Sequence, residues 1–499
     1  MLEILEKLAP ALGSMLSWQP LLIILLGVLI GIVVGAMPGL SPSTGVALLV
    51  PFTYDMSPTL ALVFLVSIYI GASYGGSITA VTINSPGTAS AMVTSFDGYP
   101  LTLQGKAGVA LGVSVVASAV GGVISCLILI FFSVPLAAIA VRFHPAEYFA
   151  LAIFGLATLS SIAGKDWLKA LISASLGLAL STVGTDPISG ADRFTLGFVQ
   201  LSDGFNLIPA LIGLFALSEV FCAIERRDFS IQTVGPLGHV WPKVKDYLRL
   251  KWTIFFSSLG GTIVGIFPGA GATIASFLCY DLAKRTSKKT GEFGKGCVEG
   301  VAASESANSA SVGGALVPLL MMGIPGSATT AVLIGAMMIH KLTPGPQLYY
   351  EKPHVIYGLF AAMLIANVIL LILGLLGCHL WVRVSELPKK PLYVAITLMC
   401  FLGCFSARNS MFDVYCGMLF GITGWVMKRY GFPVAPVILG LVLGSIAETN
   451  FRRAIMMDNE FVFFSRPISA TLLAIAFLSC WIPLIGSSLK RKARGKSNS

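Results

Sequence analysis

Apolar runs and short polar segments alternate along most of the chain. Two of the runs, "LLIILLGVLIGIVVGAM" (21–37) and "VIYGLFAAMLIANVILLILGLLGC" (355–378), have close to or more than the ~20 residues that a helix needs to cross a bilayer. No stretch is long and polar enough to form a separate soluble domain. The pattern therefore predicts an all-α polytopic membrane protein with roughly 11–12 spans.

Pro-Gly pairs interrupt the apolar runs at Pro38-Gly39, Pro86-Gly87, Pro268-Gly269 and Pro325-Gly326. Proline lacks an amide hydrogen and clashes with the preceding helical turn, and glycine permits the bend that follows. The backbone groups that such a break frees cannot face lipid, so they must lie against protein or line a wet cavity. Each pair therefore predicts a broken helix or a hairpin tip inside the membrane domain.

The chain contains two similar halves. "GIVVGAMPG" at Gly31 and "GTIVGIFPG" at Gly261 share their glycine spacing and lie 230 positions apart. "YGGSITAVTINSPGTASAM" (74–92) matches "SVGGALVPLLMMGIPGSATTAV" (311–332) at an offset of 238 or 239. Self-similarity over such long segments indicates an internal duplication.

The duplication predicts the domain organisation. We expect a first membrane repeat at 1–225, with a hairpin at about 20–54 and a broken helix at about 58–98. A basic cytoplasmic linker at 226–250 follows. The second repeat, 251–499, is expected to have a hairpin at about 251–283, a broken helix at about 299–340 and a basic C-terminal tail.

Charge predicts the orientation of these segments. Only 11% of the residues are charged, and the net charge of +10 comes from loop clusters such as 226–251 and 284–295 and from the tail. Basic loops favour the cytoplasmic side, so both clusters and the C-terminus are expected inside, and 249–283 must be a re-entrant hairpin. The crossings between the halves then make the repeats inverted, as in many secondary transporters. We interpret the basic balance as membrane orientation and expect no nucleic-acid partner.

Small and hydroxyl residues follow each break. A helix that starts after a break directs free amides and its positive dipole end at the cavity, which suits an anion. Carbonyls of the preceding half-helix, with hydroxyls and amides, suit a small cation. Helix kinking and close helix packing are the alternative explanation. The candidate substrate and cation site comprises Pro38, Gly39, Ser41, Ser43, Thr44, Asn84, Ser85, Pro86, Gly87, Thr88, Pro268, Gly269, Gly271, Thr273, Glu305, Asn308, Pro325, Gly326, Ser327 and Thr329.

Glu305 lies in "EGVAASESANSASVGG", a stretch that is otherwise free of charge beyond Glu299. Carboxylates inside a membrane are costly and mark functional sites, although capping of a helix start is the alternative role. We expect Glu305 to take part in coupling to Na⁺ or H⁺, with no other cofactor. No lysine or arginine is close to the breaks in sequence, and Asp97 in "FDGYP" is expected at a turn or helix end.

"GASYG" (71–75) fits the G-x-S-x-G pattern of hydrolases, with Ser73 as the nucleophile. No strand precedes it, and the five histidines lie mostly near span ends or in loops. An intramembrane serine hydrolase is therefore the second hypothesis, and a stand-alone anion channel is the third. The leading prediction is a transporter without enzymatic activity.

Several motifs together resemble the large transmembrane subunit of the tripartite tricarboxylate transporter family. They are "GAMPGLSPSTGVALLVPFTY", "YGGSITAVTINSPGTASAMVTSFDGYPLTLQGKAG", "GTDPISGADRFTLG", "GIFPGAGATIASFLCYDLAKR" and "GVAASESANSASVGGALVPLLMMGIPGSATTAVLIGAMMIHKLTPGP". The resemblance implies cation-coupled uptake of di- or tricarboxylates across a bacterial inner membrane. It also implies a small membrane subunit and a periplasmic solute-binding protein as partners. The family's usual prolines are replaced here by Thr79, Ala89 and Ser304, and a usual asparagine by Ser309, which affects the substrate more than the mechanism.

Overall fold

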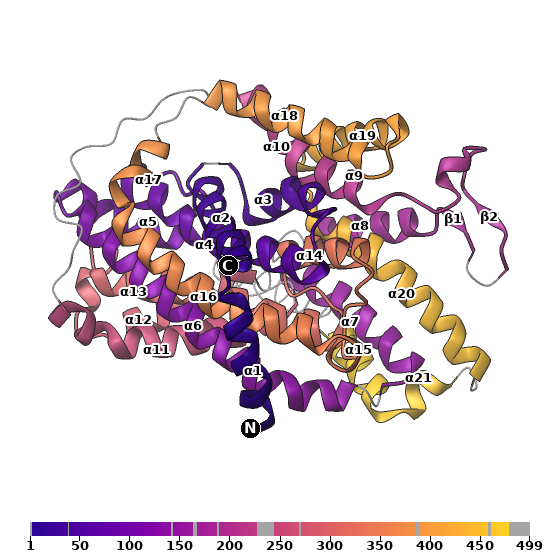
Figure 1. The fold of residues 1–499 in the computed structure, drawn as a ribbon, viewed down its shortest axis with the longest axis horizontal. Helices are drawn as coiled ribbons and strands as arrows, with labels where there is room; N and C mark the ends of the chain where they lie inside the picture. The colour runs from indigo at the N-terminus through magenta and orange to yellow at the C-terminus, as the bar shows by residue number, and fades with distance from the viewer. Residues whose placement is uncertain are drawn as a thin grey trace, which may run out of the picture.

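The computed structural model describes residues 2–37, 39–140, 143–162, 167–186, 189–226, 244–268, 271–385, 389–457 and 461–478 (Figure 1). Helices account for most of these residues, and the two short strands β1 (Gly184–Thr185) and β2 (Asp192–Arg193) pair antiparallel at one edge of the molecule in Figure 1. The all-α prediction is confirmed for the part of the chain that is described.

The first half contains the helices α1 (Leu2–Met15), α2 (Trp18–Gly35), α3 (Pro42–Leu49), η1 (Val50–Thr53), α4 (Pro58–Ile83), α5 (Ala91–Leu103), α6 (Ala107–Ala140), α7 (Pro145–Ile162), α8 (Trp167–Ser181), η3 (Val199–Leu201), α9 (Leu207–Leu211), the π-helix η4 (Ile212–Leu217) and α10 (Ser218–Arg226). The second contains α11 (Val244–Ile266), α12 (Gly271–Thr286), η5 (Thr290–Glu292), α13 (Val298–Met322), α14 (Ala328–Ile339), α15 (Gln347–Glu351), α16 (Pro353–Leu376), α17 (Cys378–Ser385), α18 (Lys389–Ser406), α19 (Met411–Arg429), α20 (Ala435–Met457) and α21 (Val462–Ser465).

Among the described residues, five segments are long and apolar enough to cross a membrane: Trp18–Gly35, Pro58–Ile83, Ala107–Ser133, Leu207–Arg226 and Pro353–Leu376. Six shorter apolar helices accompany them. These helices make the chain a polytopic membrane protein, and the number of 11–12 spans stays a prediction. The proposed linker lies mostly outside the described residues, as does the basic tail from residue 479.

The two broken helices occupy the interior. Every residue of α4 from Ala61 to Thr82 is buried, and so is every residue of α13 from Gly300 to Met321. α2 packs along α4, and α11 packs along α13. Glycines permit both contacts, because a Cβ atom at Gly31 or at Gly261 would collide with the backbone of the facing helix. The small residues that interrupt the apolar runs therefore allow the central helices to pack closely.

The local geometry of the two broken helices recurs at an offset of 239 residues. α4 ends at Asn84 (φ 52°) and α13 at Gly323 (φ 72°), both in the left-handed conformation. The amide after each of these residues donates to the carbonyl six positions earlier, at 3.3 Å and 3.2 Å. After the Pro-Gly pair, the hydroxyls of Thr88 and Ser327 each accept the amide three residues later, at 3.3 Å and 3.2 Å. The same backbone geometry thus occurs in both halves.

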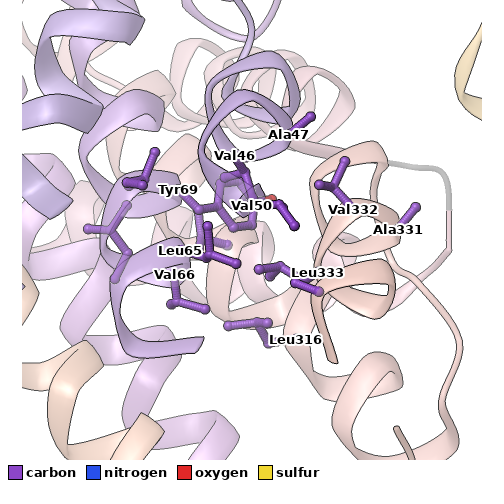
Figure 2. Close-up of a cluster of buried hydrophobic side chains, with 14 of the residues drawn as sticks. Val46, Ala47, Val50, Leu65, Val66, Tyr69, Leu316, Ala331, Val332 and Leu333 are labelled. Atoms are coloured by element: carbon purple, nitrogen blue, oxygen red, sulfur yellow. The ribbon is translucent and has the colours of Figure 1, made fainter. Parts of the chain in front are cut away.

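The second arm of each hairpin packs against the other half. α3 contacts α14, and α12 contacts α5. In the second of these interfaces, the Phe96 ring lies 5.9 Å from the rings of Phe277 and Tyr280. Figure 2 shows the first interface, where side chains from α3, η1, α4, α13 and α14 meet: Val46, Ala47, Val50, Leu65, Val66, Tyr69, Leu316, Ala331, Val332 and Leu333.

α4 and α13 run antiparallel where they meet. The amide of Asn308 in α13 donates to the carbonyl of Ser73 in α4 at 2.9 Å. Tyr69, one turn earlier in α4, contacts Ser327, which follows the end of α13. The earlier residue in α4 therefore contacts the later residue of the second half, as expected for antiparallel segments. How the halves lie relative to a bilayer stays a prediction.

Candidate functional site

The second break connects the end of α13 to α14. Ser327 is the N-cap of α14 and forms a reciprocal capping box with Thr330, at 3.2 Å and 2.8 Å. The Ser327 hydroxyl also lies 3.2 Å from the hydroxyl of Tyr69 in α4. Pro325, Gly326 and Thr329 are buried around it. The start of α14 is thus attached to the central helix of the other half by a hydroxyl pair.

The first break is also closely packed. Gly87 and Thr88 are buried, Ser85 and Pro86 are half-buried, and Asn84 is exposed. A Cβ atom at Gly87 would collide with the backbone oxygen of Gly35 in α2. Gly326 is similarly confined, because a Cβ there would lie 2.7 Å from Cα of Ala315. Both glycines therefore permit backbone contact, as the packing explanation expects.

The tip of the first hairpin holds a trio of hydroxyls. Ser41 is the N-cap of α3, and its oxygen lies 2.8 Å from the hydroxyls of both Ser43 and Thr44. Thr44 also donates to the carbonyl of Phe215 in the π-helix at 3.5 Å. Gly39 adopts φ 95°, which favours glycine, whereas Pro38 lies outside the described residues. π-Helical segments often occur at functional sites, and the π-helix η4 contacts Thr44, one of the predicted site residues.

The tip of the second hairpin has fewer described contacts. Pro268 is buried, and Gly269 lies outside the described residues. Gly271 adopts φ 61° in open space, and Thr273 is half-buried at the start of α12. This tip stays part of the predicted site without a hydrogen-bonded cluster like that of Ser41.

Glu305 lies at the centre of a buried polar cluster. Its side chain is 0% exposed. The hydroxyl of Thr94 in α5 donates to one carboxylate oxygen, and Ser118 in α6 donates to the other at 3.1 Å. Thr94 also lies 3.0 Å from the hydroxyl of Ser304. None of the described residues forms an ion pair with Glu305, so an ionised form would be a buried charge without a counterion. The sequence-based alternative, capping of a helix start, is wrong because Glu305 lies inside α13.

Asn308 lies one turn after Glu305, on the same helix. Its side chain is 0% exposed, and its amide group joins α13 to the carbonyl of Ser73. Its Oδ1 atom has no hydrogen-bond partner among the described residues. A buried acceptor of this kind is available to a ligand.

The structure thus brings part of the predicted site together. Glu305 and Asn308 share one face of α13, and Tyr69 links the second break to α4. In the described chain, no hydrogen bond joins Thr88 to Ser327 or either one to the Ser41 trio. Those of the predicted site residues that the structure describes therefore form separate groups around α4 and α13.

A cavity of about 380 Å³ opens at the second break. Met322, Gly323 and Ile324 form the wall on the side of α13, and Gln347, Asn450 and Arg453 contribute polar groups. Arg453 has no ion-pair partner among the described residues, whereas Arg452 beside it pairs with Asp186 and Glu448. No sequence pattern indicates Arg453, because it lies in α20, far along the chain from the second break, and only the fold brings the two together.

A second cavity, of about 450 Å³, lies at the other end of α13. Val298 and Glu299 line it together with three basic residues, Lys106, Arg249 and Lys289. Glu299 accepts hydroxyl hydrogen bonds from Thr253 at 2.8 Å and Ser287 at 2.6 Å. Cavities with polar residues in their walls therefore open at both ends of α13, the helix that carries Glu305.

Asp97 is a further buried carboxylate, and the expectation of a turn or helix end is wrong. It lies within α5 and is 0% exposed. Its Oδ1 accepts three backbone amides that precede α13, from Gly294 (2.8 Å), Gly296 (3.0 Å) and Cys297 (2.8 Å). Oδ2 accepts the Tyr280 hydroxyl at 2.8 Å. Because all these partners belong to the second half, Asp97 holds the two halves together.

Ser73 is part of a continuous helix. Its hydroxyl donates to the carbonyl of Tyr69 at 2.9 Å, and it lies inside α4 rather than on a strand–helix elbow. His340 contacts Thr53 of η1 at 3.0 Å. The described residues contain no cluster of His, Cys, Asp and Glu that could hold a metal ion. This geometry gives no support to a hydrolytic site at Ser73.

A comparison with protein families matches residues 21–439 to the tripartite tricarboxylate transporter TctA family. The chain belongs to this family. A protein of Agrobacterium vitis, described as an uncharacterized 52.8 kDa protein in the TAR-I ttuC' 3' region, is 38% identical over 453 residues, which is 90% of each chain. A second A. vitis protein, from the TAR-II ttuC' 3' region, is 39% identical over 229 residues, which is 46% of this chain and 95% of that one. No solved structure matches. Membership in the family makes this chain a subunit of a tripartite transporter, a class of membrane transport proteins rather than enzymes.

Proposed function

We propose that this chain is the permease subunit of a binding-protein-dependent secondary transporter. It imports di- or tricarboxylates or related organic anions, and Na⁺ or H⁺ drives the uptake. A small membrane subunit and a periplasmic solute-binding protein complete the transporter. The chain crosses the bacterial inner membrane several times, with its C-terminus in the cytoplasm.

Arg453, which has no ion-pair partner among the described residues, lies in the wall of the 380 Å³ cavity and carries this proposal. A guanidinium binds carboxylates through paired hydrogen bonds, and Asn450 and Gln347 in the same wall add polar contacts. The cavity volume lies within the range of small-molecule sites, about 300–1,000 Å³. Under the predicted orientation, the segment after α20 faces the periplasm, where the binding protein delivers its substrate.

Glu305 supports coupling to a cation. It lies between the two cavities, is fully buried and has hydroxyl partners but no basic partner in the part of the chain that the structure describes. Binding of H⁺ or Na⁺ neutralises such a carboxylate and so stabilises the conformation in which it is buried. Cation binding on this helix is thereby connected to the opening of cavities at its ends.

The recurrent geometry supports alternating access between inverted halves. The broken helices share the same caps, run antiparallel at Asn308 and Ser73, and contact the hairpin of the opposite half. In secondary transporters with inverted repeats, rocking of one half against the other exposes the site to each side in turn.

Uptake by membrane vesicles tests the proposal. Vesicles with this chain and a small membrane subunit should accumulate a labelled dicarboxylate or tricarboxylate only when a solute-binding protein is added and a Na⁺ or H⁺ gradient is imposed. Equilibration without accumulation would replace the proposal with the channel hypothesis. Accumulation that is independent of the binding protein would remove the predicted partner.

A further inference from the structure

A small cavity with both apolar and polar residues in its wall lies between α4, α6, α13 and α16, one helical turn from Glu305. Its volume is about 10 Å³, close to the space that one water-sized particle occupies. Ser125 of α6, Ser309 of α13 and Asn367 of α16 supply the polar groups in its wall. Gly122 and Gly313 leave room for them, because a Cβ atom at either position would meet the side chain of Asn367 or Ser125.

Asn367, in the wall of this cavity, has a buried amide group. Asn367 is 2% exposed, and its Nδ2 atom donates to the carbonyl of Met363 at 2.8 Å. That bond determines the orientation of the amide, since the reversed group would place two carbonyl oxygens against each other. Oδ1 has no hydrogen-bond partner among the described residues.

Ser309 differs from the other serines of α13. Ser304, Ser306 and Ser311 each donate to a carbonyl in the preceding turn, at 3.1 Å, 2.7 Å and 2.6 Å. The Ser309 hydroxyl is buried, with 5% of the residue exposed, and has no such bond in the described chain. On the opposite wall, Ser125 donates its proton to the carbonyl of Gly122 at 3.0 Å, which leaves its lone pairs free.

Three side chains that carry oxygen atoms, from three different helices, therefore line the cavity. Hard cations take carbonyl and hydroxyl oxygens as ligands, and this donor set contains no nitrogen or sulfur. Glu305 lies four residues before Ser309, about 6 Å along the helix axis, and Ser118, its partner on α6, lies four residues before Gly122. An uncompensated carboxylate thus lies on the same helix faces as the cavity and favours a positively charged occupant.

We propose that Ser125, Ser309 and Asn367 form a binding site for one Na⁺ ion, and that Glu305 supplies the balancing negative charge. The role of this ion in coupling rests on the proposed function, whereas its binding does not. The site differs from the one predicted after the Pro-Gly breaks, because none of the three ligands belongs to a break. A neutral water molecule held by the same oxygens is the competing occupant.

Thermal unfolding of the full-length protein, purified in detergent, tests the site without any transport step. NaCl is titrated against choline chloride or KCl at constant ionic strength. We expect a saturable rise of the unfolding midpoint with Na⁺ alone, because a ligand that binds only the folded state stabilises it. Ser309→Ala and Asn367→Ala should each raise the half-saturating Na⁺ concentration at least tenfold.

Ser306→Ala is the matched control, because this serine is buried on the same helix and its hydroxyl donates to the carbonyl of Ala302. It should bind Na⁺ as the unmodified protein does. Glu305→Gln should weaken Na⁺ binding as well. Equal midpoints in Na⁺ and choline would overturn the site and assign the cavity to water. Unchanged Na⁺ binding in Ser309→Ala and Asn367→Ala would also overturn it.

Uptake measurements separate this site from the proposed function. A protein that binds Na⁺ through Ser309 and Asn367 but accumulates no carboxylate supports the site and overturns the proposed function. Na⁺-driven uptake with the same Na⁺ dependence in Ser309→Ala as in the unmodified protein overturns the site and leaves the proposed function intact.

Discussion

The hydroxyl of Tyr69 lies 3.2 Å from the hydroxyl of Ser327, and this pair joins the middle of α4 to the start of α14. Tyr69 belongs to the first half and Ser327 to the second, so a change of the angle between the halves must alter this contact. Tyr69 is buried and belongs to the apolar cluster of Figure 2, which also contains Val332 and Leu333 of α14.

Tyr69→Phe removes this hydroxyl and keeps the ring. We expect the apparent KM for carboxylate uptake to rise about fivefold, since one lost hydrogen bond is worth about 1 kcal/mol. Tyr415→Phe is the control, because Tyr415 is 63% exposed on α19. Initial uptake rates in vesicles measure the effect. An unchanged KM in Tyr69→Phe would separate this contact from transport.

Glu305→Gln should abolish accumulation while it preserves the fold. The amide keeps the volume and can still accept one hydroxyl hydrogen bond, and removal of a buried charge does not destabilise a protein core. We expect accumulation to fall at least tenfold, with an unchanged or higher unfolding midpoint in Na⁺-free buffer. Asp281→Asn, at an exposed ion pair with Arg285, is the control. Normal accumulation in Glu305→Gln would exclude this carboxylate from coupling.

Arg453→Gln should raise the KM for carboxylates at least tenfold, equivalent to about 1.4 kcal/mol or more. The guanidinium is the only basic group in the wall of that cavity among the described residues, so its loss removes the charge that attracts the substrate. Arg429→Gln removes an exposed charge that pairs with Glu225 and should leave KM unchanged. If both variants behaved alike, the cavity would have no specific role in substrate binding.

Asp97→Ala should destabilise the protein by about 3 kcal/mol or more, because it leaves buried backbone amides without their acceptor. Asp281→Ala breaks the exposed pair with Arg285 and should cost less than about 1 kcal/mol. The unfolding midpoint and the yield of folded protein report both effects. Equal midpoints for the two variants would contradict a role for Asp97 in joining the halves.

Local signals in the sequence predicted where the helices break and identified Glu305 as a carboxylate within the membrane domain. A Pro-Gly pair in an apolar run interrupts a helix wherever it occurs, and a carboxylate in a chargeless stretch is conspicuous without a structure. The hydrogen bonds of Asp97 and the position of Arg453 in a cavity wall both depend on residues far away in the chain, which no local sequence pattern indicates. The sequence leaves the offset of the predicted repeat at 238 or 239, and the similar helix ends at Asn84 and Gly323 lie 239 positions apart.

The break glycines require a different test from the one that the sequence suggests. If Gly87 and Gly326 left space for substrate, leucine at either position would block transport in a folded protein. In the structure, Gly87 faces the backbone of Gly35, and Gly326 faces Ala315. Even Gly87→Ala must therefore displace the end of α2 from the first break, and we expect a clear loss of folded protein from both glycine variants.

Thr88→Ala and Ser327→Ala separate substrate binding from packing. Each hydroxyl caps a helix, at 3.3 Å and 3.2 Å, so its removal should destabilise the protein by about 1 kcal/mol and still permit folding. If the starts of α5 and α14 bind the carboxylate, both variants should raise KM severalfold, whereas packing alone predicts an unchanged KM. Thr88→Ser and Ser327→Thr keep a hydroxyl at each helix start and should have the KM of the unmodified protein. Folded Gly87→Leu protein with normal uptake would exclude the first break from the binding site.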